Sequence, residues 1–299
     1  MQKHKTLLCS LLVMLLWGLL FPTVKLGYRV FGIGETGDIL LFAGVRFLVC
    51  GLVITAFALL RNPAALRPLK KCWPWVLLAG LFAIILHYSF TYLGLSLTDG
   101  SKTAILKQLG AVFYICFSAL FFHEDKLTWR KLLGLALGLS GILAINTGAA
   151  GLSISVGDLL IIAASFCTVF SNVVSKKVFR VAEPLITTGI SQLFGGIVLL
   201  GVGLLAGGKP AAVLPATADQ FGIFGLIVAA SAVSYCLWFL IVQRENLSGL
   251  FIVKFIEPLF AALFAWLLLG EDIFKLQYPI ALLLITAGVA IGKKSQGES

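Results

Sequence analysis

The chain has 299 residues, of which 60% are hydrophobic and 12% are charged, and its mean hydropathy is +1.03. Because a soluble domain carries about 25% charged residues, this composition excludes an ordinary soluble protein and indicates an integral membrane protein. The net charge of +10 does not predict nucleic-acid binding, since the basic residues neither cluster on one helix nor alternate with stacking aromatic residues.

The apolar residues fall into stretches of the length that a membrane helix requires. A bilayer core about 30 Å thick needs roughly 20 apolar residues per helix, and turn-forming segments separate the stretches. The sequence predicts an all-α polytopic membrane fold with ten transmembrane helices, at 7–27, 39–60, 74–95, 101–122, 130–147, 157–178, 185–206, 220–242, 248–269 and 275–292. The first stretch follows a charged start, Lys3-His4-Lys5, but it is too long for a cleaved signal peptide and lacks an A-x-A site, so we expect it to be retained.

The basic residues predict an orientation, because Lys and Arg accumulate in cytoplasmic loops. With the N-terminus inside, fifteen Lys and Arg residues lie on the inner side and five on the outer side. We therefore expect a multi-pass protein of the bacterial cytoplasmic (inner) membrane with both termini in the cytoplasm. The remaining three basic residues, Arg46, Lys107 and Lys254, lie inside predicted helices.

A stretch from Ser101 to Asp125 recurs 147 residues further on, from Ser248 to Asp272. Ser, Ile, Lys, Phe, Leu, Glu and Asp repeat in register at 101/248, 105/252, 107/254, 113/260, 120/267, 124/271 and 125/272. We interpret this as an internal duplication, with repeats at 1–148 and 152–294 of five helices each. Because five is odd, the second repeat enters the membrane from the opposite side, and inverted repeats of this kind are typical of secondary transporters that work by alternating access.

Two of the lysines inside helices, Lys107 and Lys254, occupy equivalent positions in the two repeats. Each lies six residues into its helix, from opposite sides, so the pair is predicted to flank the midplane about 12 Å apart along the membrane normal. A charge costs about 2.5–3.5 kcal/mol at that depth, and two ammonium groups facing one cavity would attract an anion or a carboxylate-bearing zwitterion. Alternatively, each lysine snorkels to its nearer surface, or Lys254 pairs with Glu257 at i+3.

Glu257 precedes Pro258, and a proline within a helix removes a backbone hydrogen bond and bends the helix. The first repeat has Gly110-Ala111 at the equivalent place, so we expect both repeats to weaken a helix at one level, where freed backbone groups face a cavity. Glu257 is either a proton-coupling site or the neutralising partner of Lys254. Arg46 either contacts the substrate or anchors its helix to an oxygen atom elsewhere.

Polar and aromatic side chains at helical spacing provide further candidates for a cavity wall, although single Ser and Thr residues in membrane helices usually bond their own backbone. His87 is predicted to be either a proton relay or an interhelical hydrogen bond. Besides the two lysines, the candidate substrate-binding residues are Trp17, Phe21, His87, Tyr88, Gln108, Asn172, Tyr235 and Trp238.

No catalytic or cofactor motif is recognisable. The chain has no G-x-S-x-G, H-E-x-x-H or Walker A sequence, and its six cysteines and three histidines form no metal-ligand pattern. The acidic pairs Glu124-Asp125 and Glu271-Asp272 end repeats that face opposite sides of the membrane, so they cannot form one site. We therefore expect no enzymatic activity, no cofactor and no metal; an intramembrane enzyme is the alternative from a different class.

Small residues at i and i+4 allow membrane helices to approach closely. The spacing Gly134-x-x-x-Gly138-x-x-Gly141 near the end of the first repeat and Gly288-x-x-x-Gly292 near the end of the second has this form. Either these glycines pack helices within the bundle or they form the interface of a homodimer.

Four motifs occur in a characteristic order: Leu16-Trp17-Gly18 with Lys25, Val45-Arg46-Phe47, Glu257-Pro258-Leu259-Phe260 through Gly270-Glu271-Asp272, and Ala287-Gly288. Together they resemble the drug/metabolite transporter (DMT) superfamily in its ten-helix EamA-type form. The resemblance covers nearly the whole chain. It implies two five-helix repeats around a central substrate cavity, lined mainly by the first, third, fourth, sixth, eighth and ninth helices.

Within that superfamily, sugar-phosphate translocators hold an anion with a lysine on the fourth helix and a Lys-Arg pair on the ninth. Lys107 and Lys254 look similar, but Phe255 stands where that arginine would be. The sequence therefore departs here from the phosphate-binding pattern of the translocators. The four-helix multidrug branch binds cations through a glutamate in its first helix, and no acidic residue lies between Leu7 and Lys25 here.

The leading hypothesis is therefore a secondary transporter of a small anionic or zwitterionic metabolite, such as an amino acid or organic acid, bound between Lys107 and Lys254. The alternative is an exporter of cationic or aromatic compounds with proton coupling through Glu257. In either case the expected partners are the small-molecule substrate and the lipid bilayer.

Overall fold

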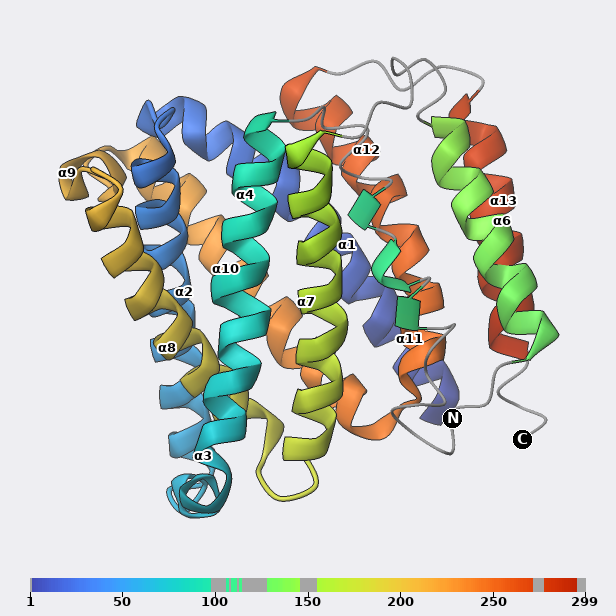
Figure 1. Cartoon of the computed structure of the whole chain (residues 1–299), viewed down its shortest axis with the longest axis horizontal. Helices are drawn as coiled ribbons and strands as arrows, with labels where there is room; N and C mark the ends of the chain where they lie inside the picture. The colour runs from blue at the N-terminus through green and yellow to red at the C-terminus, as the bar shows by residue number, and fades with distance from the viewer. Residues whose placement is uncertain are drawn as a thin grey trace.

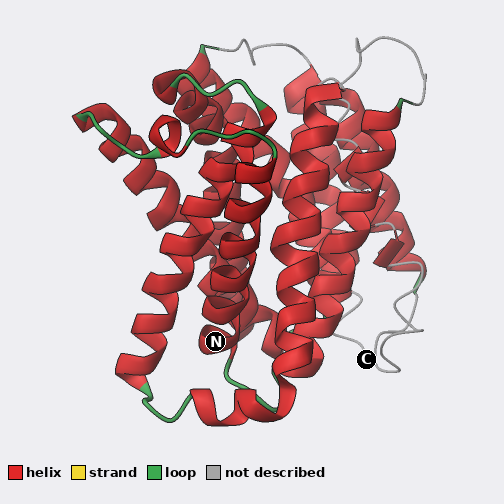
Figure 2. Ribbon diagram, turned by 60° about the vertical axis from the view of Figure 1, so that its left-hand side comes forward, coloured by secondary structure: helices red, strands yellow, loops and turns green. Residues whose placement is uncertain are grey.

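The computed structural model describes residues 2–97, 106–107, 109–111, 113–114, 128–145, 155–270 and 277–294. In these ranges the regular structure is entirely helical, and the long helices lie alongside one another in a bundle (Figure 2). The α-helices are α1 (Gln2–Phe31), α2 (Thr36–Arg61), α3 (Leu66–Gly80), α4 (His87–Leu97), α6 (Trp129–Ile145), α7 (Val156–Val178), α8 (Pro184–Leu205), α9 (Pro210–Val213), α10 (Ala218–Arg244), α11 (Leu247–Val253), α12 (Glu257–Leu269) and α13 (Gln277–Lys294). A π-helix, η1 (Leu81–Leu86), joins α3 to α4, and a 3₁₀ turn, η2 (Lys254–Ile256), joins α11 to α12.

Within the described residues, these helices cover nine of the ten predicted stretches. Most helix ends differ from the predicted ends by a few residues. Most of the remaining stretch, 101–122, lies outside the described residues, and the parts of it that are described, such as 109–111, are helical. Seven of the described helical runs are long and apolar enough to cross a membrane. The chain is therefore an all-helical, multi-pass membrane protein.

The expected weakening of the helix before Pro258 is confirmed. In a continuous α-helix the N–H of residue 258 would donate to the carbonyl of residue 254, but proline has no N–H. The Glu257 N–H donates to the Lys254 carbonyl instead, which is the i to i+3 bond of a 3₁₀ turn. As a result, α11 ends at Val253, and α12 restarts at Glu257 with Pro258 in its first turn.

Helices α2 and α8 form the closest helix pair in the described bundle and lie side by side in Figure 1. Glycines spaced seven residues apart line both sides of this contact: Gly37, Gly44 and Gly51 on α2 and Gly189, Gly196 and Gly203 on α8. A Cβ atom on Gly196 would lie 2.5 Å from the Leu48 backbone nitrogen, and one on Gly51 would lie 2.6 Å from the Leu193 nitrogen. Backbone therefore packs directly on backbone along this glycine seam, as small residues allow in membrane helices.

Helices α6 and α13 pack closely as well, and they lie together on the right of Figure 1. A Cβ atom on Gly288 would lie 2.7 Å from the Gly134 carbonyl oxygen and 3.0 Å from the Gly138 nitrogen. The glycine face that was also considered for a homodimer is thus occupied within the bundle.

Three further contacts position the centre of the molecule. Helix α1 packs against α10 and α12, and α4 packs against α7. Each of these contacts joins a helix from the first half of the chain to one from the second half.

Candidate functional site

The Lys254 ammonium group lies among aromatic rings near the centre of the bundle. Its Nζ atom is 5.2 Å from the centroid of the Trp17 ring, 5.7 Å from that of Trp238 and 5.6 Å from that of Phe251. The Trp17 and Trp238 rings are 4.9 Å apart. A cation within about 6 Å of an aromatic face is stabilised by the ring quadrupole. The aromatic cage of Trp17, Trp238 and Phe251 therefore stabilises the Lys254 ammonium group inside the bundle.

Local backbone structure creates this arrangement. The 3₁₀ turn begins at Lys254 and changes the direction of its side chain relative to a continuous helix. On the opposite side, Gly18 follows Trp17, and a Cβ atom there would lie 2.5 Å from the Phe260 Cβ atom. The glycine lets α1 approach α12 closely, which brings Trp17 against Lys254.

Asn172 fixes the orientation of Trp238. Its Oδ1 atom accepts a hydrogen bond of 2.7 Å from Trp238 Nε1, and its Nδ2 atom donates to the Thr168 carbonyl at 2.7 Å. Both side chains are buried, with 3% of Asn172 and 2% of Trp238 exposed. Because a buried indole N–H requires an acceptor, Asn172 is a positioning residue for the cage.

Tyr88 on α4 and Tyr235 on α10 meet through their hydroxyl groups, with 2.8 Å between the two oxygens. The two tyrosines are 147 residues apart, the offset of the internal duplication. Tyr235 also packs edge-on against Trp17, with ring centroids 6.1 Å apart. The tyrosine pair therefore adjoins the cage directly.

Arg46 is 3% exposed and lies behind the tyrosine pair. Its guanidinium carbon is 4.6 Å from the Phe47 ring and 5.5 Å from the Tyr88 ring. Its Nε atom is buried without a hydrogen-bond partner. The Tyr92 hydroxyl is instead within hydrogen-bonding reach of the rest of the Arg46 side chain, and the Phe47 and Tyr88 rings pack against its guanidinium group.

His87 bridges two helices. Its Nδ1 atom lies 3.0 Å from the Ala164 carbonyl oxygen and 3.0 Å from the Thr168 hydroxyl on α7. A carbonyl can only accept, so Nδ1 carries the proton. Of the two roles considered for His87, the structure contains the interhelical hydrogen bond.

Lys107 and Glu257 lie near the cage. The charges of Lys107, Lys254 and Glu257 are close enough to interact electrostatically, but no ion pair joins Lys254 to Glu257, both of which the structure describes. The Glu257 carboxylate interacts electrostatically with both lysines, and its role as their neutralising partner stays a prediction. Two further candidates are not assessed: Gln108 lies outside the described residues, and the side chain of Phe21 does as well.

The arrangement suits binding better than bond-breaking chemistry. Among the described residues, Lys107 and Lys254 interact electrostatically with one carboxylate, Glu257, and a third cation, Arg46, lies next to Tyr88. The described residues contain no cluster of His, Cys, Asp and Glu that would hold a metal ion. A surplus of positive charge in a low-dielectric interior favours an anionic group.

Comparison with known proteins identifies the family of the chain. The model of the EamA-like transporter family matches the chain twice, at residues 4–147 and 155–291. The chain belongs to the EamA-like transporter family. The two matches fall close to the repeats predicted from the sequence.

Several EamA-like relatives span most of the chain. The uncharacterized inner membrane transporter YedA of Escherichia coli K12 is 27% identical over 288 residues, which cover 92% of this chain and 88% of YedA. An S-adenosylmethionine/S-adenosylhomocysteine transporter of Chlamydia muridarum is 25% identical over 266 residues, covering 85% and 81% of the two chains. A crystal structure that is 20% identical superposes with a TM-score of 0.78 over 96% of both chains, which shows a shared fold. This EamA-like chain is therefore a membrane transporter.

Sequence reasoning missed Phe251, which completes the cage, and Phe47, whose ring centroid is 4.6 Å from that of Tyr88. Phe251 could have been found from its position one helical turn before Lys254. Phe47 is the residue after Arg46 and was noted only as part of an EamA motif.

Proposed function

We propose that this chain is a secondary transporter with ten transmembrane helices in two inverted repeats, which moves a small anionic or zwitterionic metabolite across the cytoplasmic membrane by alternating access. The observation that carries the substrate class is the aromatic cage around Lys254, next to the further cations Lys107 and Arg46. The substrate carboxylate would bind between Lys107 and Lys254. The cage rings would pack against an apolar or aromatic part of the same molecule.

The pattern of helix contacts supports the inverted repeats. An offset of 147 residues relates α1 to α7, α2 to α8, α4 to part of α10, and α6 to α13. Under this relation, the α1–α10 contact corresponds to the α7–α4 contact, while α2–α8 and α6–α13 each correspond to themselves. The bond between the Tyr88 and Tyr235 hydroxyls also corresponds to itself, which is expected of a contact on a twofold pseudo-symmetry axis.

The basic residues support the orientation. The α2–α3 and α7–α8 connections lie at the same end of the bundle as the start of α1 (Figure 1). Arg61, Arg67, Lys177 and Arg180 lie in or next to these connections. This is the end that the positive-inside rule assigns to the cytoplasm.

Relatives suggest which carboxylate-bearing metabolites to test first. Two relatives, one of them 25% identical, carry names that specify S-adenosylmethionine and S-adenosylhomocysteine. Such molecules combine a carboxylate with an aromatic ring system. That is the combination that a lysine inside an aromatic cage would recognise.

Glu257 supports the second candidate, an exporter of cationic or aromatic compounds coupled to protons. Glu257 is a carboxylate that interacts with Lys107 and Lys254 inside the bundle, and in this alternative it would exchange the coupling proton. However, the cage already holds the Lys254 ammonium group, which would repel a cationic substrate at that position. The anionic or zwitterionic class is therefore favoured.

The test compares ligands that differ only in a carboxylate. Purified protein is melted with S-adenosylmethionine and methionine, and with their decarboxylated amines. The carboxylates should raise the melting temperature, because a ligand at 100 times its Kd stabilises the folded state by about 2.7 kcal/mol, and Lys254→Met should abolish the shift. Lys177→Met removes an exposed lysine and serves as the matched control. Stabilisation by the amines alone, or an undiminished shift in Lys254→Met, would contradict the proposal.

A further inference from the structure

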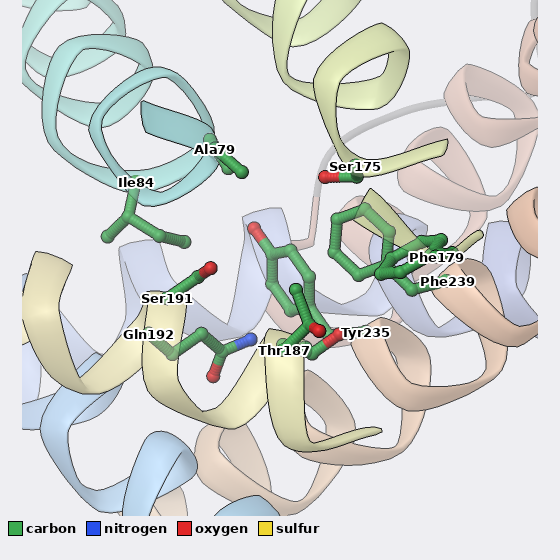
Figure 3. Close-up of a pocket in the computed structure, with 11 residues that line it drawn as sticks. Ala79, Ile84, Ser175, Phe179, Thr187, Ser191, Gln192, Tyr235 and Phe239 are labelled. Carbon is green, nitrogen blue, oxygen red and sulfur yellow. The ribbon is translucent and has the colours of Figure 1, made fainter. Parts of the chain in front are cut away.

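A crevice opens between five elements of the bundle, beside the tyrosine pair. It is narrow, with room for about one water molecule or one small polar group, and Figure 3 shows the side chains that surround it. Its walls come from α3 and η1, the end of α7, the start of α8 and the second half of α10: Ala79, Ala83, Ile84, Ser175, Phe179, Thr187, Thr188, Ser191, Gln192, Tyr235 and Phe239. This set includes α8, the seventh predicted helix, which the family resemblance does not assign to the central cavity.

Gln192 contributes an amide group without a partner. The side chain is 1% exposed, and neither its Oε1 nor its Nε2 atom forms a hydrogen bond. Figure 3 shows the amide directed into the space between Ser191 and Thr187. Leaving a buried polar group unpaired costs about 1–3 kcal/mol. A leucine at position 192 would therefore make the folded protein more stable than the glutamine does.

The backbone beside the crevice is also irregular. Ala83 and Ile84 belong to the π-helix η1, and π-helical segments are frequent at functional sites. The neighbouring polar groups are mostly satisfied locally: Ser191 donates to the Val76 carbonyl at 3.1 Å, and Thr188 donates to the Pro184 carbonyl at 2.7 Å. The Gln192 amide is therefore the unsatisfied group of this wall.

Tyr235 connects the crevice to the aromatic cage. It lines the crevice and also packs against Trp17, whose ring contacts the Lys254 ammonium group. The crevice lies toward the end of the bundle where α7 ends and α8 begins, which is the end proposed to face the cytoplasm. A continuous series of contacts thus leads from that end, past Tyr235, to the cage.

We propose that the crevice is a second binding subsite on the cytoplasmic branch of the transport path, where the Gln192 amide hydrogen-bonds an uncharged donor–acceptor group of the solute, such as a carboxamide or a hydroxyl. This rests on the proposed function, since the path is that of a transporter. It adds to that function a requirement on the solute: a carboxylate for the lysines and, at the other end, a neutral group that both donates and accepts.

The test measures access to the crevice and does not require the natural substrate. Ser175→Cys changes one atom of the crevice wall, and the protein in lipid nanodiscs is treated with the anionic thiol reagent (2-sulfonatoethyl) methanethiosulfonate. Ile197→Cys, on the outside of α8 and 60% exposed, is the control in contact with lipid, and the unmodified chain gives the background of native cysteines. Ser175→Cys should react at least about tenfold faster than Ile197→Cys, because only a thiol in contact with water ionises and reacts. Equal rates would overturn the proposal.

Two variants test the amide itself. In the Ser175→Cys background, Gln192→Leu should slow labelling several-fold while raising the melting temperature, because it removes an unpaired polar group, and Gln192→Asn should keep the rate. A Gln192→Leu variant that lowers the melting temperature and leaves the labelling rate unchanged would show a structural amide and overturn the proposal.

Two amino acids test the ligand class. L-glutamine, which has a carboxamide end, should slow labelling of Ser175→Cys more than L-norleucine, which has an apolar end. Equal effects would overturn the assignment of the ligand class. The labelling rate without ligand reports access to the crevice alone, so Lys254→Met should leave it unchanged. A wrong assignment of the carboxylate site can therefore be told from a wrong assignment of the crevice.

Discussion

The α2–α8 seam and the aromatic cage are built on opposite principles. Along the seam, backbone packs on backbone, and glycines such as Gly44 and Gly196 leave no room for side chains. Around the cage, large aromatic rings surround a lysine, the neighbouring helix changes to a 3₁₀ turn, and Arg46 Nε has no hydrogen-bond partner. The seam gains dispersion and close-packing energy, whereas the cage retains desolvated charge that lowers stability.

This difference separates the residues that hold the halves together from those that bind. A membrane protein gains little from burying apolar side chains, because lipid is as apolar as its own core. Close packing at the seam can therefore offset the cost of charges at the cage. Substitutions in the two regions should have distinct signatures: loss of folded protein at the seam, and loss of ligand binding with an intact fold at the cage.

The largest expected effect is at the seam. Gly196→Ala places a Cβ atom 2.5 Å from the Leu48 nitrogen, so α2 and α8 must separate, at a cost of about 1–3 kcal/mol or more. Gly201→Ala, on the same helix with no atom within 4 Å of its added Cβ, is the matched control and should stabilise the helix by about 0.5–1 kcal/mol. Thermal unfolding in detergent measures both. Similar melting temperatures for the two variants would mean that the seam does not hold the bundle together.

An intermediate effect is expected where the cage depends on one hydrogen bond. Asn172→Leu removes the acceptor for Trp238 Nε1, which frees the ring to rotate and should weaken ligand binding about tenfold, equivalent to about 1.4 kcal/mol. Ser171→Ala, at the residue before Asn172, removes another hydrogen bond to the Thr168 carbonyl and should have little effect on ligand binding. Titration of the melting temperature with a carboxylate ligand gives the affinities.

A double-mutant cycle separates positioning from direct contact. In a Trp238→Phe background the ring has no N–H for Asn172 to accept, so adding Asn172→Leu should cost little more. Additive losses would indicate that Asn172 acts independently of Trp238.

The sequence predicted most of the helices and the break before Pro258, because both follow from local chemistry. Apolar length determines where a helix spans the membrane, and Pro258, which has no N–H, removes a hydrogen bond of the α-helix beside Lys254–Ile256. The candidate list also contained Trp17, Trp238 and Lys254, because a buried lysine and amphipathic aromatic residues stand out in an apolar chain.

Tertiary packing accounts for what the sequence did not predict. Asn172 and Trp238 are 66 residues apart, and only the arrangement of α7 and α10 makes them partners. The heptad spacing of glycines such as Gly189 and Gly196 is visible in the sequence, but it indicates a close-packed face without saying which helix covers it. No residue in the run Leu81–Leu86 distinguishes a π-helix from an α-helix, and its irregularity was not predicted.

The smallest expected effect concerns the tyrosine pair, which joins the two halves at the cage. Tyr88→Phe and Tyr235→Phe each remove one hydroxyl of a 2.8 Å hydrogen bond and leave the other unpaired, at a cost of about 1 kcal/mol. If the two hydroxyls lie on a pseudo-symmetry axis, the single variants should lower the melting temperature equally, by roughly 2–4 °C. The double variant removes both polar groups and should cost less than the sum of the two. Unequal single effects, or a fully additive double variant, would mean that the two hydroxyls have different surroundings, and the equivalence of the two halves at this contact would be lost.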